Sequence, residues 1–168
     1  MGNDVSFKSK ERNIDKCFYM SNTLTTVSIS VLALSGSYFA KSIREKEIVM
    51  WLSEHDYAVC GLGTYGFEIT EIPWVREFVL KIIDGALKKV GWELLDYEPF
   101  EEGVFKALNE FKNLILMIES IDVIESEYCE WKGYGDINPI LKPPEGFPKC
   151  LKHGVYLHFG GCVICNDK

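Results

Sequence analysis

One stretch of this sequence predicts local structure from its spacing: Cys150-Leu-Lys-His153-Gly154-Val-Tyr-Leu-His158-Phe-Gly-Gly-Cys162-Val-Ile-Cys165-Asn166. It contains a C-x-x-H pair and a C-x-x-C pair, separated by a short gap. A structural tetrahedral zinc site takes four cysteine or histidine ligands and leaves no open position. The spacing therefore predicts one structural Zn²⁺ bound by Cys150, His153, Cys162 and Cys165.

The residues that flank the two pairs fit the same interpretation. In a metal-binding knuckle the chain turns back after the second ligand, often through a positive φ angle. Gly154 and Asn166 follow the two second ligands, and these residue types adopt that angle most easily. Alternating apolar residues over 155–159, followed by Gly160-Gly161, predict a short strand and a tight return. The arrangement resembles a minimal zinc ribbon or zinc knuckle of the Cys3His type, which implies a closed structural site.

Other interpretations of this stretch stay open. The cysteines are also compatible with buried thiols beside a chance histidine, or with a disulfide between Cys162 and Cys165. His158 is a substitute ligand, ranked second to His153 because on an extended strand it points to the opposite face from Leu157.

Composition limits the class of protein and the class of partner. A chain of 168 residues with 47% hydrophobic and 26% charged residues is expected to form one domain with a sizeable core. Its net charge of −7 disfavours nonspecific binding to nucleic acids or anionic membranes, and suits a basic protein partner. No apolar run approaches the roughly 18 residues of a membrane span. Scattered single cysteines indicate a reducing compartment, so we expect a cytoplasmic protein.

The hydrophobic pattern predicts an α/β (α+β) fold, with a mixed sheet packed by about three helices. Strands are expected at Thr23–Leu34, Tyr57–Ile72 and Trp92–Tyr97, and helices near 39–53, 73–90 and 100–118. The predicted organisation has four parts: a polar N-terminal arm (1–20), the α/β core (21–132), a Pro/Gly-rich linker (133–149) and the zinc-knuckle-like tail (150–168).

The sequence contains no recognisable catalytic motif. Gly61-Leu-Gly63-Thr-Tyr-Gly66 spells G-x-G-x-x-G, but it leads into an extended segment rather than a helix, and is interpreted as a glycine-rich turn. Cys60 with His55 as its base is a conceivable nucleophile pair without a supporting motif. No catalytic residue is therefore predicted.

In general appearance, a small acidic chain of this kind resembles the bacterial immunity proteins that neutralise nuclease toxins. That resemblance implies a non-catalytic inhibitor whose acidic side chains cover a basic cleft, and complementary charge would speed association. Two alternatives remain: an enzyme with an unrecognised acidic or Cys/His site, and an adaptor protein that binds through its zinc knuckle.

Overall fold

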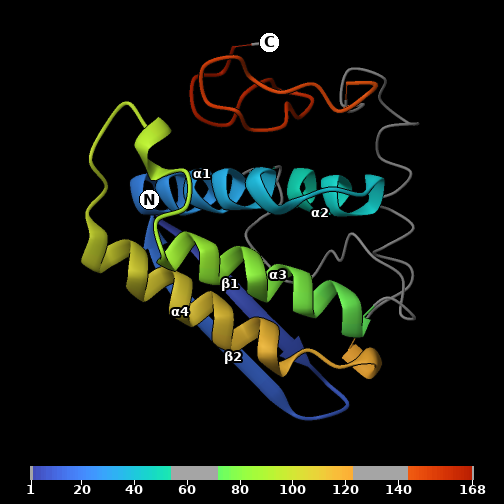
Figure 1. Ribbon diagram of the computed structural model, residues 1–168. Helices are drawn as coiled ribbons and strands as arrows, with labels where there is room; N and C mark the ends of the chain where they lie inside the picture. Colours follow the sequence, from blue (N-terminus) through green and yellow to red (C-terminus); the bar gives the residue numbers. More distant parts are fainter. Residues whose placement is uncertain (1, 54–71, 123–143, 168) are drawn as a thin grey trace.

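The computed structural model describes residues 2–53, 72–122 and 144–167 (Figure 1). In chain order these residues form strands β1 (Gly2–Ser9) and β2 (Ile14–Ser21), helices α1 (Asn22–Phe39), α2 (Ile43–Ser53), α3 (Ile72–Leu87) and α4 (Glu101–Met117), and single 3₁₀ turns at Trp92–Leu94 and Ser120–Asp122. Four helices and a two-stranded antiparallel sheet make an α+β domain, as the predicted fold class requires.

Helix α1 lies at the centre of the domain, and the strand predicted at Thr23–Leu34 is wrong. Ser21 caps the helix, its hydroxyl accepting from the Leu24 N–H at 3.1 Å. All ten residues from Ser28 to Ser37 are buried, so this part of the helix has no exposed face. Its sequence therefore lacks the alternation of apolar and polar faces, with a period of 3.6 residues, by which a surface helix is recognised. Its serines and threonines alternate with apolar residues by chance, and several of their hydroxyls bond to the carbonyl four residues earlier: Thr25, Thr26 and Ser30.

Small residues on α1 let its neighbours pack closely. A Cβ atom at Gly36 would lie 2.7 Å from a methyl carbon of Val49 on α2, so only glycine permits this approach of the two helices. The Ser35 hydroxyl donates to the Ile82 carbonyl of α3 at 2.7 Å and satisfies a buried polar group.

The N-terminal residues form a β-hairpin and not the loose polar arm expected over 1–20. Strands β1 and β2 pair in antiparallel register from Gly2 opposite Ser21 to Ser9 opposite Ile14. Buried side chains on one face join the main core: Val5, Phe7 and Met20.

Arg12 in the hairpin turn fastens the hairpin to the end of α4. Its guanidinium donates to Asp122 Oδ1 at 3.1 Å and to Glu119 Oε1 at 2.7 Å, and also to the Met117 carbonyl. Asp122 has a fully buried side chain, and burial disfavours its charge. Bonds from Arg12 and Ser9 nevertheless lower the pKa of Asp122 below its usual value, so the ion pair persists at neutral pH.

The three predicted helices are confirmed as α2, α3 and α4, with ends shifted by a few residues. Ser42 and Glu45 form a reciprocal capping box at the start of α2, with distances of 3.2 and 2.7 Å. The predicted mixed sheet is not found in the described part of the chain. Trp92–Tyr97 is a 3₁₀ turn followed by a loop, and Tyr57–Ile72 lies outside the described residues except for Ile72, which begins α3.

The C-terminal segment lies on the opposite side of α1 from α3 and α4 (Figure 1). It contacts α1 through a small apolar cluster of its own, formed by Ala33 and Leu34 with Cys150, Val155 and Cys162. The tail is therefore packed on the domain. Of the predicted linker, residues 133–143 lie outside the described residues. No helix in the described ranges is long and apolar enough to cross a membrane.

Candidate metal centre

Two backbone turns of the same design hold the predicted ligands. In each turn the cysteine N–H donates to the carbonyl five residues later, and the N–H four residues later donates back to the cysteine carbonyl. All four bonds measure 2.8 Å: Cys150 N to Val155 O, Gly154 N to Cys150 O, Cys162 N to Asp167 O, and Asn166 N to Cys162 O.

The predicted left-handed conformations are confirmed at both turns. Gly154 has φ of +65° and Asn166 has φ of +60°. These angles turn the chain back directly after His153 and Cys165, so each turn directs its two side chains to the same point.

The segment between the turns differs in part from expectation. Gly160-Gly161 makes the predicted tight return, with His158 and Gly161 exchanging backbone bonds of 3.0 and 2.9 Å. The expected strand over 155–159 is reduced to isolated bridges, at Tyr156 and at His158. The gap is too short for two full strands to pair.

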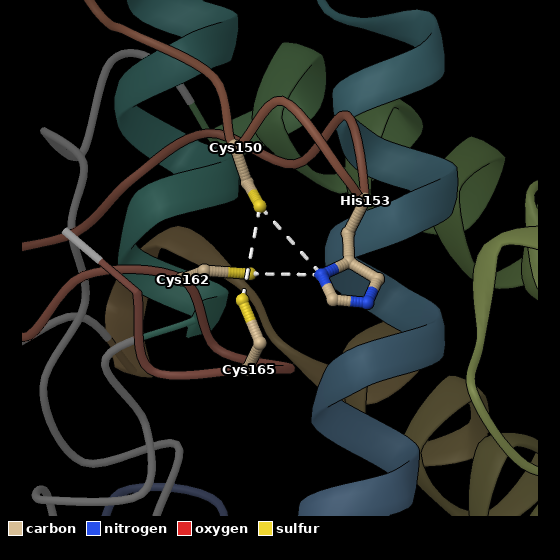
Figure 2. Close-up of side chains that lie close together, drawn as sticks. All are labelled: Cys150, His153, Cys162 and Cys165. Atoms are coloured by element: carbon tan, nitrogen blue, oxygen red, sulfur yellow. Dashed lines mark hydrogen bonds between the residues drawn. The ribbon is translucent and has the colours of Figure 1, made fainter.

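The four predicted side chains come together at one point (Figure 2). His153 Nδ1 lies 3.6 Å from Cys150 Sγ and 3.6 Å from Cys162 Sγ, and the sulfurs of Cys150 and Cys165 are 3.8 Å apart. All four ligand atoms lie within 4.8 Å of one another. Such a group is able to hold a metal ion.

The open alternatives can now be compared with this geometry. Cys150, Cys162 and Cys165 are free thiols, so no disulfide joins Cys162 to Cys165. His158 is not a member of the group. Its Nδ1 accepts from the Gly160 N–H at 3.2 Å instead. His153 is therefore the histidine of the site, as ranked from the sequence.

The site is shielded from water by α1. His153 and Cys162 are fully buried, Cys150 is 7% exposed, and Cys165 is partly exposed. Polar bonds from the same segment also reach α1: the Tyr156 N–H donates to Ser37 Oγ at 3.1 Å, and Lys149 Nζ donates to the Ser37 carbonyl at 2.8 Å.

Asp96 completes the site and was missed in the sequence. Its Oδ2 lies 3.2 Å from His153 Nε2, the ring nitrogen that points away from the sulfurs, and accepts from Lys152 Nζ at 2.6 Å. A carboxylate at this place fixes the histidine tautomer with its proton on Nε2, which leaves Nδ1 free to bind a metal. The bond from Lys152 is the main cause that lowers the pKa of Asp96, so Asp96 is ionised. No sequence signal links two residues 57 positions apart.

The three thiols differ in acidity. Burial disfavours the Cys150 thiolate, but bonds from the backbone N–H groups of His153 and Lys152 lower the pKa of Cys150 to about 7. Burial is the main cause that raises the pKa of Cys162, and it raises that of Cys165 to about 12. Metal binding to these thiols would therefore release protons and weaken as the pH falls.

The conceivable Cys60–His55 pair and the glycine-rich turn at 61–66 lie outside the described residues. Comparison with known proteins gives no relative: no family model matches the chain, and neither a curated protein nor a solved structure is significantly similar to it.

Proposed function

We propose that Cys150, His153, Cys162 and Cys165 bind one structural Zn²⁺ ion. The observation that carries this proposal is the ligand spacing. Bond lengths of about 2.3 Å to sulfur and about 2.05 Å to nitrogen give a zinc tetrahedron edges of about 3.8 Å between sulfurs and about 3.6 Å between sulfur and nitrogen. Three of the six separations in the site, at 3.6, 3.6 and 3.8 Å, agree with these edges, and all four ligand atoms lie within 4.8 Å of one another.

The ion would fasten the C-terminal segment to the face of α1. Four protein ligands leave no position for a substrate or a water molecule, so the role of the ion is structural and not catalytic. Asp96 belongs to the loop after the Trp92–Leu94 turn, and its contact with His153 extends the same fastening to that loop.

Cobalt substitution tests the geometry of the site. Co²⁺ added to the metal-free protein should give the intense visible absorption of tetrahedral thiolate coordination, and one equivalent of Zn²⁺ should abolish it. A spectrum of octahedral Co²⁺, without thiolate-to-metal absorption, would contradict a four-ligand site.

We further propose that the protein is a non-catalytic binding protein that inhibits a basic partner, such as a bacterial nuclease toxin. The net charge of −7 supports this choice, because an acidic protein attracts a basic one and is repelled by nucleic acid. Exposed charge contacts are screened by salt, so the affinity should fall as ionic strength rises.

Capture from the host organism tests the partner. The tagged, zinc-loaded protein should retain a basic protein at low salt and release it at high salt. Retention of acidic proteins alone, together with measurable catalysis by the purified protein, would favour an enzyme instead.

A further inference from the structure

Three apolar side chains lie exposed beside the metal centre. Leu151, the residue after the first cysteine ligand, is fully exposed, and Leu94 and Tyr97 are each 41% exposed. We call these three residues the Leu151 surface. Isolated exposed apolar residues are ordinary, but a group of them beside a fixed site is typical of an interaction surface.

Two contacts join the chain segments that carry these residues. Lys152, next to Leu151, forms an ion pair of 2.6 Å with Asp96, which lies between Leu94 and Tyr97 in the sequence. A Leu94 methyl carbon also lies 3.8 Å from the position that a Cβ atom of Gly154 would take. The first turn and the 92–97 segment are therefore neighbours in the fold.

The segment that carries Leu94 and Tyr97 is strongly acidic. Residues 92–102 contain five acidic residues and no lysine or arginine: Glu93, Asp96, Glu98, Glu101 and Glu102. Asp96 pairs with Lys152 and Glu101 with Lys89. Among the described residues, the other three carboxylates have no ion-pair partner.

We propose that the Leu151 surface is the docking site for the basic partner protein, so this inference rests on the proposed function. Specific interfaces combine an apolar centre with a polar border, and complementary charge selects and orients the partner. A segment that combines unpaired carboxylates with exposed apolar side chains fits a partner that presents apolar side chains among lysines and arginines. The carboxylates repel a second copy of this acidic chain.

The same geometry makes docking depend on the metal. Leu151 lies within the Cys150–His153 turn, so the ligands on both sides fix its position when the ion is bound. Without the ion the turn keeps its backbone bonds, its packing on α1 and the contacts of His153 and Lys152 with Asp96, but it loses the bonds that fix Cys150 and His153 on either side of Leu151. Metal binding should therefore fix Leu151 in the position that the partner recognises.

The test uses the zinc-loaded full chain and the partner that it captures from its host, identified by mass spectrometry and then purified. Leu151→Asp should weaken binding of that partner at least about tenfold, as expected for the centre of an interface. The control is Ile43→Asp, which places the same charge at an apolar residue of α2 that is 66% exposed. It should leave the affinity unchanged, and both variants should keep the zinc content and melting temperature of the wild type.

The possible results separate a failure of the docking-site proposal from a failure of the proposed function. Binding of a basic partner that is lost in Leu151→Asp and in chelator-treated protein supports the proposal. Equal binding of the partner by wild type and Leu151→Asp would show that the Leu151 surface is not the docking site, and would leave the proposed function unchanged. Capture of no basic partner by the wild type would overturn both. Self-association of the wild type that Leu151→Asp abolishes would assign the surface to a second copy, and the basic partner would be wrong.

Discussion

Replacing Cys162 with serine tests whether the metal holds the C-terminal segment in place. Cys162 is fully buried between the site and the Ala33–Leu34 part of α1. Binding of a structural Zn²⁺ contributes about 10–16 kcal/mol in small zinc-binding peptides at neutral pH. Complete burial of one apolar side chain such as Val155 contributes about 1.5–3 kcal/mol. The metal thus contributes several-fold more than any one buried side chain of the segment, and removing one ligand should loosen the segment.

The expected change in melting temperature follows from linkage. Free zinc at 1,000 times its dissociation constant stabilises the folded state by about 4.1 kcal/mol, which for a chain of this length corresponds to about 8–16 °C. We expect the wild type to lose about this much in chelator. Cys162→Ser should melt at the same temperature with and without zinc.

Cys17→Ser is the matched control, because Cys17 is an exposed cysteine on β2, outside the group of four ligands and in no disulfide. It should keep the zinc-dependent melting temperature. Hydrogen exchange should show fast exchange of the Gly154 and Asn166 amides in Cys162→Ser, while the α1 amides stay protected. A zinc-dependent melting temperature retained by Cys162→Ser, or a wild type that chelator does not affect, would refute the reasoning.

Three further outcomes follow from individual side chains. Asp96→Asn should weaken zinc binding by about 10–100-fold in a competition titration. Lys152→Met removes only the exposed ion pair and should change the zinc affinity little. Equal losses of zinc affinity in the two variants would show that the carboxylate does not act through the histidine. His158→Ala should keep its full zinc content by elemental analysis, and loss of the metal would make it a ligand after all. Because the pKa of Asp122 is lowered in the folded state, its pair with Arg12 stabilises fully above the unfolded value near 3.8, and this stability is lost as the pH falls through the folded value. Asp122→Asn should therefore lower the melting temperature at neutral pH and flatten its decline below about pH 4; a decline as steep as that of the wild type would contradict the assignment.

The local structure of the site was predictable because its ligands lie close together in the sequence. Two pairs of ligands and two residues that tolerate positive φ specify both turns without any tertiary information, and Gly154 and Asn166 adopt the expected angles. The packing of the tail on α1 was not predictable, since Val155 gives no sign of which helix it will contact. Asp96 was missed for the same reason.

The errors in the predicted secondary structure have a common physical cause. Amphipathic helices such as α4 reveal themselves by one apolar stripe, and the predicted helix at 100–118 agrees closely with Glu101–Met117. Helix α1 is buried over ten consecutive residues by neighbours on every side, so its sequence has no helical period and its small residues imitate strand alternation. The hairpin formed by β1 and β2 buries only a few side chains, too weak a pattern for a strand to be recognised.

Metal analysis of the protein purified without a histidine tag or chelator tests the central claim most directly. We expect about one equivalent of zinc per chain, and three thiols that react with a thiol reagent only after a chelator is added. Protein that is folded but carries no zinc, with Cys150, Cys162 and Cys165 freely reactive, would contradict the account.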